Sequence, residues 1–71
     1  MNVEFGDAVR YARKQCGYSQ EQLARKLNVS FATVNRWESG KSSPRPIAEK
    51  AFLKLCKIKK IDISQYKGKD A

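Results

Sequence analysis

Residues 30–39, SFATVNRWES, carry side chains that could make directional contacts with another molecule. On a helical wheel, Val34 and Trp37 point to one side. The other side holds Ala32, Asn35, Arg36 and Ser39, with Phe31 and Thr33 on the flanks. Arginine can bind guanine, asparagine can bind adenine, and apolar carbons can contact the thymine methyl group, so this side has the groups that read base edges. The alternative is a solvated helix face, which is the better interpretation of an isolated helix.

The rest of the chain offers little for catalysis or metal binding. It has no histidine and no CxxC motif. It also has no nucleophile beside a base, no paired carboxylates at helical spacing and no glycine-rich phosphate loop. Cys16 and Cys56 fall on the apolar sides of helical patterns, so we interpret them as small core residues. We therefore expect no enzyme activity, no metal site and no cofactor.

The chain is strongly basic for its length. Its 71 residues include 15 Lys and Arg against 7 Asp and Glu, which gives a formal net charge of +8. This excess favours a polyanionic partner, either nucleic acid or an anionic membrane surface, over a merely solvated surface. Nucleic acid is slightly preferred. The length allows one domain. No apolar run is long enough to span a bilayer and no signal-peptide segment follows the start, so we expect a cytoplasmic protein that does not enter membranes.

Apolar residues at helical spacing predict a first and a last helix. The first covers residues 3–16, with an inward stripe of Phe5, Val9, Ala12 and Cys16. Gly17 ends this helix. The last begins near Pro46 and has an inward set of Ile47, Ala51, Phe52, Leu55 and Cys56. After Cys56 we expect a loop with at most one helical turn. We therefore divide the chain into a domain over residues 1–58 and a poorly defined basic segment over residues 59–71.

A tight corner joins two short helices between these, over about 19–27 and 30–39. Ser19 and Gln22 form a capping box, and Ser30 caps the following helix. Asn28 lies where the chain must reverse, and asparagine tolerates the left-handed conformation that this reversal needs. Neither helix is long enough to be stable alone. The corner therefore makes each helix support the other and makes the second one protrude.

Residues 18–41, YSQEQLARKLNVSFATVNRWESGK, resemble the helix-turn-helix of the phage repressor and Cro family, including its bacterial XRE-like members. The matching residues are Ser19, Gln20, Leu23, Ala24, Leu27, Val29, Ser30, Val34, Trp37, Glu38 and Gly40. The resemblance extends over residues 5 to about 56. It implies an all-α, compact four- to five-helix bundle whose third helix enters the DNA major groove while the second lies across the backbone. It also implies a bacterial or phage-derived protein associated with the nucleoid.

The resemblance assigns roles to single residues. The base-reading positions are Phe31, Ala32, Thr33, Asn35 and Arg36. The phosphate-binding positions are Ser19, Gln20, Ser30, Lys41, Ser42, Ser43 and Arg45. Arg13 and Glu38 match a structural ion pair between helices. The expected function is sequence-specific binding of double-stranded DNA in transcriptional control.

Two other functions remain open. The chain could be an interaction module of the antitoxin type, or the DNA-targeting part of a larger protein. Many members of the family dimerise through a fifth helix, which is not evident after Cys56. We therefore expect a monomer or a weak homodimer that forms on palindromic DNA.

Overall fold

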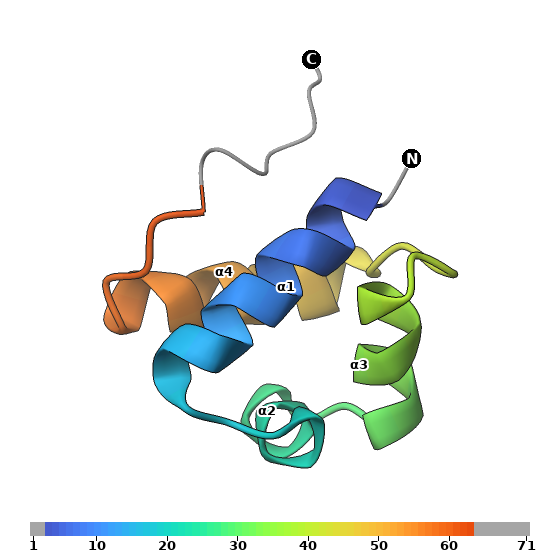
Figure 1. Cartoon of the computed structure of the whole chain (residues 1–71), viewed down its shortest axis with the longest axis horizontal. Helices are drawn as coiled ribbons and strands as arrows, with labels where there is room; N and C mark the ends of the chain where they lie inside the picture. The colour runs from blue at the N-terminus through green and yellow to red at the C-terminus, as the bar shows by residue number, and fades with distance from the viewer. Residues whose placement is uncertain (1–2, 64–71) are drawn as a thin grey trace.

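The computed structural model describes residues 3–63, with side chains from Phe5 onward, as four helices. They are α1 (Val3–Cys16), α2 (Gln20–Leu27), α3 (Phe31–Glu38) and α4 (Pro46–Ile58). Residues 3–63 contain no strand, which confirms the all-α fold class. Figure 1 shows α2 and α3 meeting at a corner below and beside α1, with α4 behind it. None of the described helices is long and apolar enough to cross a membrane.

The starts of α2 and α3 are fixed by serine side chains. The Ser19 hydroxyl accepts a hydrogen bond from the Gln22 amide at 3.0 Å, and the Gln22 side-chain oxygen accepts one from the Ser19 amide at 2.8 Å. This capping box confirms the sequence prediction. The Ser30 hydroxyl accepts a hydrogen bond from the Thr33 amide at 3.1 Å. Both helices therefore begin where local chemistry places them.

All four helices end in the same way, with one residue at positive φ. These residues are Gly17 (75°), Asn28 (60°), Gly40 (77°) and Lys60 (58°). The amide of the next residue donates to a carbonyl five residues earlier, at 2.8–3.0 Å, as in the Schellman motif. The donors are Tyr18, Val29, Lys41 and Ile61. The prediction for Asn28 is confirmed. Three of the donors pack on the core, whereas Lys41 is exposed.

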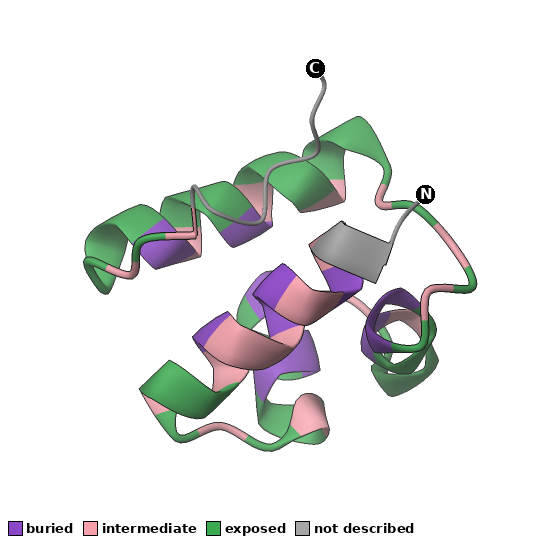
Figure 2. Cartoon of the chain, turned by 45° about the horizontal axis from the view of Figure 1, so that its top comes forward, coloured by how far each residue is buried: buried purple, intermediate pink, exposed green. Residues whose placement is uncertain are grey.

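The core lies where the four helices face one another, as the buried stretches in Figure 2 show. Its largest fully buried side chains are Trp37, Phe52, Leu23, Val9 and Val34. Phe5 links α3 to α4, because its ring lies edge-on to the rings of both Trp37 and Phe52 with centroids 5.5 Å apart. One cluster of apolar contacts thus connects three helices that are far apart in the sequence.

The close approach of α1 to α3 requires a glycine. A Cβ atom at Gly6 would collide with the carbonyl oxygen of Trp37 and crowd the Cα of Glu38. Both contacts are with backbone, so no side chain could move aside to make room. Gly6 therefore allows α3 to pack against α1 at backbone distance.

The sequence prediction for Ile47 is wrong. Its side chain is 84% exposed, whereas Phe52 and Cys56 of the same helix are buried. The apolar residues of α4 cover a wide arc, and only the part around Phe52 and Cys56 meets the core. Leu53 and Ile58 are exposed as well.

Both cysteines are free thiols, and the prediction that they are core residues is confirmed for Cys56, which is buried, whereas Cys16 is half-buried at the edge of the core. Burial, with a smaller contribution from Cys16, raises the pKa of the Cys56 thiol to about 11. Beyond α4, Ile61 and Ile63 pack against the core, past the limit of residue 58 expected from the sequence. No fifth helix has begun by Ile63, and residues 64–71 lie outside the described part of the chain.

Candidate nucleic-acid interface

α3 presents one face to the core and the opposite face to solvent. Val34 and Trp37 are buried, while Ala32, Asn35 and Arg36 are exposed. Phe31, the first residue of the helix, is 51% exposed although it is a large apolar side chain. Thr33 is half-buried, and its hydroxyl lies 2.9 Å from that of Ser30. The five predicted base-reading residues therefore lie on one short helix, and four of them are exposed.

The end of α3 is held by a buried carboxylate. Glu38 is 8% exposed and pairs with Arg13, whose Nε lies 2.7 Å from Glu38 Oε2 and whose Nη2 lies 3.2 Å from Oε1. This is the ion pair that the resemblance implied. Its two parallel contacts fix both the distance and the relative orientation of α1 and α3. Arg13 also donates to the backbone carbonyl of Tyr18 at 3.1 Å. The same guanidinium therefore contacts both Glu38 and the segment that follows α1.

A second arginine of α1 adds to this site. Arg10 Nη2 donates to the backbone carbonyl of Glu38 at 2.8 Å, and its Nε lies 3.6 Å from the Glu38 carboxylate. It thereby satisfies one of the carbonyls that a helix leaves without an internal partner at its C-terminus. Sequence reasoning did not identify Arg10. Its position three residues before Arg13, on the same side of α1, was the available signal.

The contacts of Glu38 continue outward to the exposed face of α3. Gln20 Nε2 donates to Glu38 Oε1 at 3.0 Å, and Asn35 Nδ2 donates to Gln20 Oε1 at 3.2 Å. We call Glu38, Arg10, Arg13, Gln20 and Asn35 together the Glu38 network. Its hydrogen bonds and ion pairs connect α1, α2 and α3 in addition to the apolar core that these helices share. Nothing in the spacing of these residues had indicated the link from Gln20 to Asn35.

The predicted phosphate-binding residues lie at helix ends and in the loop after α3. The Ser19 hydroxyl accepts a cap hydrogen bond and keeps a hydrogen to donate, whereas the Ser30 hydroxyl accepts its cap bond and also shares a hydrogen bond with the Thr33 hydroxyl. In the loop, Lys41, Ser43 and Arg45 are exposed and Ser42 is half-buried. Arg45 occupies the N-cap position of α4, and among the described residues no side chain caps that helix. Pro46, the first residue of α4, has no N–H, and the positive end of the helix dipole at this uncapped terminus favours an anion.

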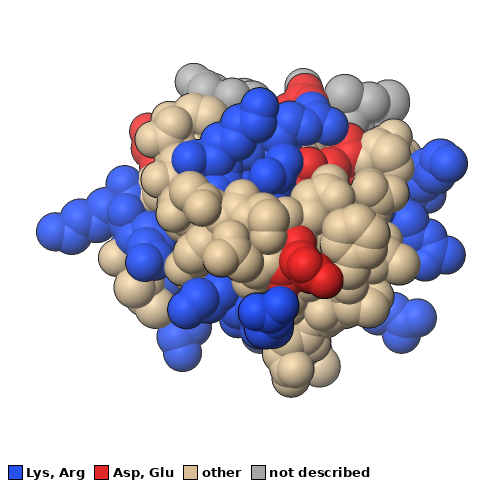
Figure 3. Space-filling view, turned by 60° about the horizontal axis from the view of Figure 1, so that its bottom comes forward, with Lys and Arg blue, Asp and Glu red and all other residues tan. Residues whose placement is uncertain are grey.

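Figure 3 looks onto the side of the molecule where α2 lies. Lysine and arginine atoms lie along the edges of this view and in a group near its top, whereas acidic atoms cover small areas. Among the described residues, no cluster of potential metal ligands occurs. The viewed side of the described chain is therefore mostly basic where it is charged, and α3 exposes polar and apolar side chains.

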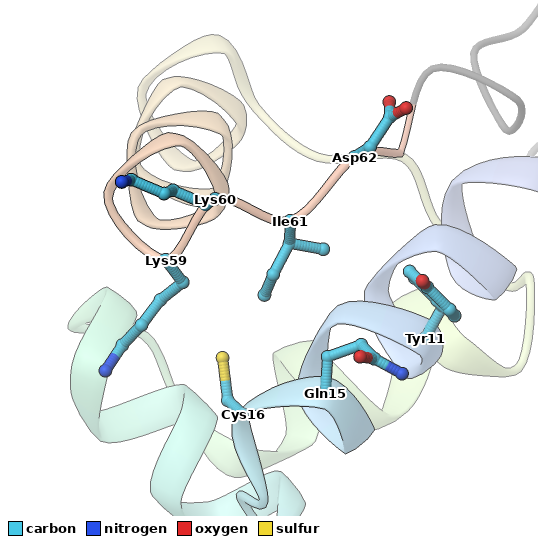
Figure 4. Close-up of a pocket in the computed structure, with 7 residues that line it drawn as sticks. All are labelled: Tyr11, Gln15, Cys16, Lys59, Lys60, Ile61 and Asp62. Carbon is cyan, nitrogen blue, oxygen red and sulfur yellow. The ribbon is translucent and has the colours of Figure 1, made fainter.

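An open cavity of about 450 Å³ lies elsewhere, between the end of α1 and the segment after α4. Figure 4 shows Cys16 and Ile61 directed into it from opposite sides, with Lys59 and Gln15 at its edge. None of the residues predicted for base reading or phosphate binding lines it. This cavity is therefore separate from the surface of α3.

The short α2, the tight corner at Asn28 and the half-exposed α3 define a helix-turn-helix. Residues 9–62 match the model of a protein family described as helix-turn-helix, and the chain belongs to this family. The all-α fold and the resemblance seen in the sequence are thereby confirmed.

Two regulators are similar in sequence to this chain. The HTH-type transcriptional regulator DicA of Escherichia coli (strain K12) is 40% identical over 43 residues, which are 61% of this chain and 32% of DicA. The HTH-type transcriptional activator BcrR of Enterococcus faecalis is 34% identical over 56 residues, which are 79% of this chain and 28% of BcrR. The chain thus spans about a third of the length of these relatives. No solved structure gives a significant match.

Proposed function

We propose that this chain binds double-stranded DNA in a sequence-specific manner, with α3 in the major groove, as part of a transcriptional regulator. The observation that carries the proposal is the division of α3 into two faces. Val34, Trp37 and Glu38 are buried and fix the helix, while the groups suited to base edges remain exposed. The names of the two regulators support the same function. A transcriptional regulator must reach the chromosomal DNA, so we propose that the protein is located in the cytoplasm.

The exposed residues of α3 divide by the chemistry of the bases. Arg36 has a five-donor guanidinium that fits the O6 and N7 acceptors of guanine. Asn35 has the donor and acceptor that fit adenine, and Phe31 and Ala32 offer carbon atoms for the thymine methyl group. Thr33 is half-buried beside them, where its hydroxyl or methyl can contact a base edge. Four chemically different groups on one helix are enough to distinguish base pairs.

A second group of residues would hold the DNA backbone. Ser19 and Ser30 lie at the starts of α2 and α3, where the helix dipole favours a phosphate. The exposed loop with Lys41, Ser43 and Arg45 leads into the uncapped start of α4, and Ser42 lies within it. The positive charge of these groups would make binding depend strongly on salt.

The proposal is tested by comparing Arg36→Ala with Lys41→Ala on DNA selected from a random pool. Loss of a base contact removes about 1–3 kcal/mol at one base pair and relaxes the preference there. Loss of a phosphate contact weakens all sequences about equally and lowers the slope against salt by roughly one. Arg36→Ala should therefore flatten discrimination at one base pair, whereas Lys41→Ala should preserve discrimination and bind every sequence less tightly. Binding is measured on the selected site and its single-base variants at several salt concentrations.

Lys54→Ala is the matched control, because it removes an exposed lysine of α4 and has the same effect on net charge. It should change affinity less than Lys41→Ala. If Arg36→Ala and Lys41→Ala both leave DNA binding unchanged, α3 does not read DNA, and a role as a protein-interaction module takes its place.

We also propose that the isolated chain is a monomer, or a weak dimer that forms on palindromic DNA. Ile61 and Ile63 pack on the chain's own core, so they are largely used within the molecule. The exposed apolar residues of α4 lie among lysines, and like charges would oppose pairing of this surface with a second copy. Sedimentation at micromolar concentration checks this, and a stable dimer without DNA would contradict it.

A further inference from the structure

We propose that Gln20 is a positioning residue that sets the orientation of the Asn35 side chain, so that Asn35 reads adenine. This inference rests on the proposed DNA-binding function and deepens it. It starts from the hydrogen bonds that lead from the buried Glu38 carboxylate to the exposed face of α3. Each link in this chain constrains the next one.

The first link is the contact between Glu38 and Gln20. The Glu38 side chain is paired with both Arg13 and Arg10, and a carboxylate with such partners only accepts hydrogen bonds. Gln20 must therefore turn its NH₂ group toward Glu38, where Nε2 lies 3.0 Å from Oε1. The opposite orientation would place the amide oxygen of Gln20 against a carboxylate oxygen. The buried charge thus decides which end of the Gln20 amide faces inward.

The second link is the hydrogen bond between Gln20 and Asn35, through which the orientation of the Gln20 amide determines that of the Asn35 amide. Because the Gln20 nitrogen faces Glu38, its oxygen Oε1 is directed to α3 and accepts from Asn35 Nδ2 at 3.2 Å. Asn35 must then turn its own nitrogen toward Gln20, which uses one of its two N–H donors. Its second N–H and its carbonyl oxygen Oδ1 remain available on the exposed face.

One donor beside one acceptor is the pattern that fits adenine in the major groove. The N–H of Asn35 can donate to N7 while Oδ1 accepts from the N6 amino group. An asparagine without a partner can rotate its amide by half a turn and loses rotational freedom when it binds. The contact with Gln20 removes this freedom before DNA arrives, which improves both the affinity and the selectivity of the contact. We therefore assign an A·T pair to the base pair of the DNA site that Asn35 contacts.

The family resemblance gives Gln20 a different role, contact with a DNA phosphate. The two roles make different predictions for Gln20→Met, which keeps the length of the side chain and its helix propensity but removes the amide. A phosphate contact is made with any DNA sequence, so its loss would weaken all sites alike. A positioning role concerns one base pair, so its loss would be felt only there.

The test is a double-mutant cycle of Gln20→Met and Asn35→Ala. Binding is measured on the selected site and on the three variants of the base pair at which Asn35→Ala loses its preference. Asn35→Ala should lower the preference for adenine by about 10-fold or more. Gln20→Met alone should lose a large part of the same preference. In the Asn35→Ala background, Gln20→Met should have no further effect on discrimination, because the group that it positions is absent.

A uniform loss of affinity for all four bases, the same with Asn35 or Ala at position 35, would overturn the proposal and assign Gln20 to the phosphate. Gln15→Met on the exposed part of α1 is the matched control and should leave every measured preference unchanged. Thermal melts of all variants show that they are folded at the temperature of the binding measurements.

A measurement without DNA tests the positioning itself. In the NMR spectrum of the free protein, the two side-chain N–H signals of Asn35 should shift toward the values of an unstructured chain in Gln20→Met and stay unchanged in Gln15→Met. If they do not move in Gln20→Met, Gln20 does not position Asn35. If they move but the wild-type chain binds DNA without sequence preference, the proposed function fails and the assignment to adenine fails with it.

Discussion

α3 and α4 are attached to the rest of the protein by different kinds of contact. α4 is held through apolar side chains, of which Phe52 and Cys56 are buried. α3 also has a buried apolar face, but its end is fixed by the Glu38 network, in which two arginines and a glutamine surround one carboxylate. Apolar burial is not directional, whereas hydrogen bonds to a carboxylate fix distance and angle. The core therefore supplies most of the stability, and the Glu38 network sets the orientation of the exposed helix.

The largest expected effect is a loss of stability when an apolar core contact of α3 is removed. Trp37 is 2% exposed and packs edge-on against Phe5. Truncation of a buried aromatic residue to alanine costs about 3–5 kcal/mol, which is most of the stability of so small a domain. Trp37→Ala should therefore be largely unfolded at room temperature by circular dichroism. A cooperative melt near the wild-type midpoint would contradict the packing described for α3.

Glu38→Ala should have an intermediate effect of a different kind. It leaves Arg13 without its carboxylate partner and should lower the free energy of unfolding by about 2–3 kcal/mol, measured by urea titration. Glu49→Ala, which removes an exposed glutamate of α4, is the control and should cost at most about 1 kcal/mol.

The comparison predicts more for Glu38→Ala than a loss of stability. At a temperature where the variant remains folded, its affinity for the selected DNA site should fall further than its affinity for random DNA. If only stability changes and selectivity is retained, the Glu38 network does not orient α3.

The smallest expected effect is a gain, at the end of α4. Lys60 adopts a left-handed conformation with φ of 58°, which costs a residue with a Cβ atom about 1 kcal/mol relative to glycine. Lys60→Gly should therefore raise the free energy of unfolding by about this amount. Lys59→Gly removes the same charge at a residue with φ of −86°, and it should give no such gain. Thermal melts of both variants and the wild-type chain measure whether only Lys60→Gly is stabilised.

The parts of the fold set by neighbouring residues could be predicted from the sequence. The capping box of Ser19 and Gln22 and the left-handed Asn28 depend on contacts within a few residues, and the helical period alone marks Val34 and Trp37 as the inward side of their helix. The ion pair of Arg13 with Glu38 came only from the family resemblance. It joins residues 25 positions apart, and no local pattern indicates such a pair.

The features that the sequence did not predict depend on how the helices pack together. Ile47 has the apolar character and spacing of a core residue, yet none of the described helices covers it, and the helical period alone could not reveal this. Gly6 allows a close contact with the backbone of α3, a requirement that no pattern within α1 reveals. The link from Gln20 to Asn35 needs the exact angle between α2 and α3.

The two faces of α3 also determine which substitutions the protein can accept over evolutionary time. Ala32 and Arg36 are exposed, and substitutions at exposed positions usually change stability by less than about 0.5 kcal/mol. A library randomised at these two positions should therefore consist mostly of folded proteins, and related chains can acquire different targets without rebuilding the core. Asn35 is the exception, because its side chain is hydrogen-bonded to Gln20. A new residue at position 35 is best accompanied by a new residue at position 20, so these two positions should change together.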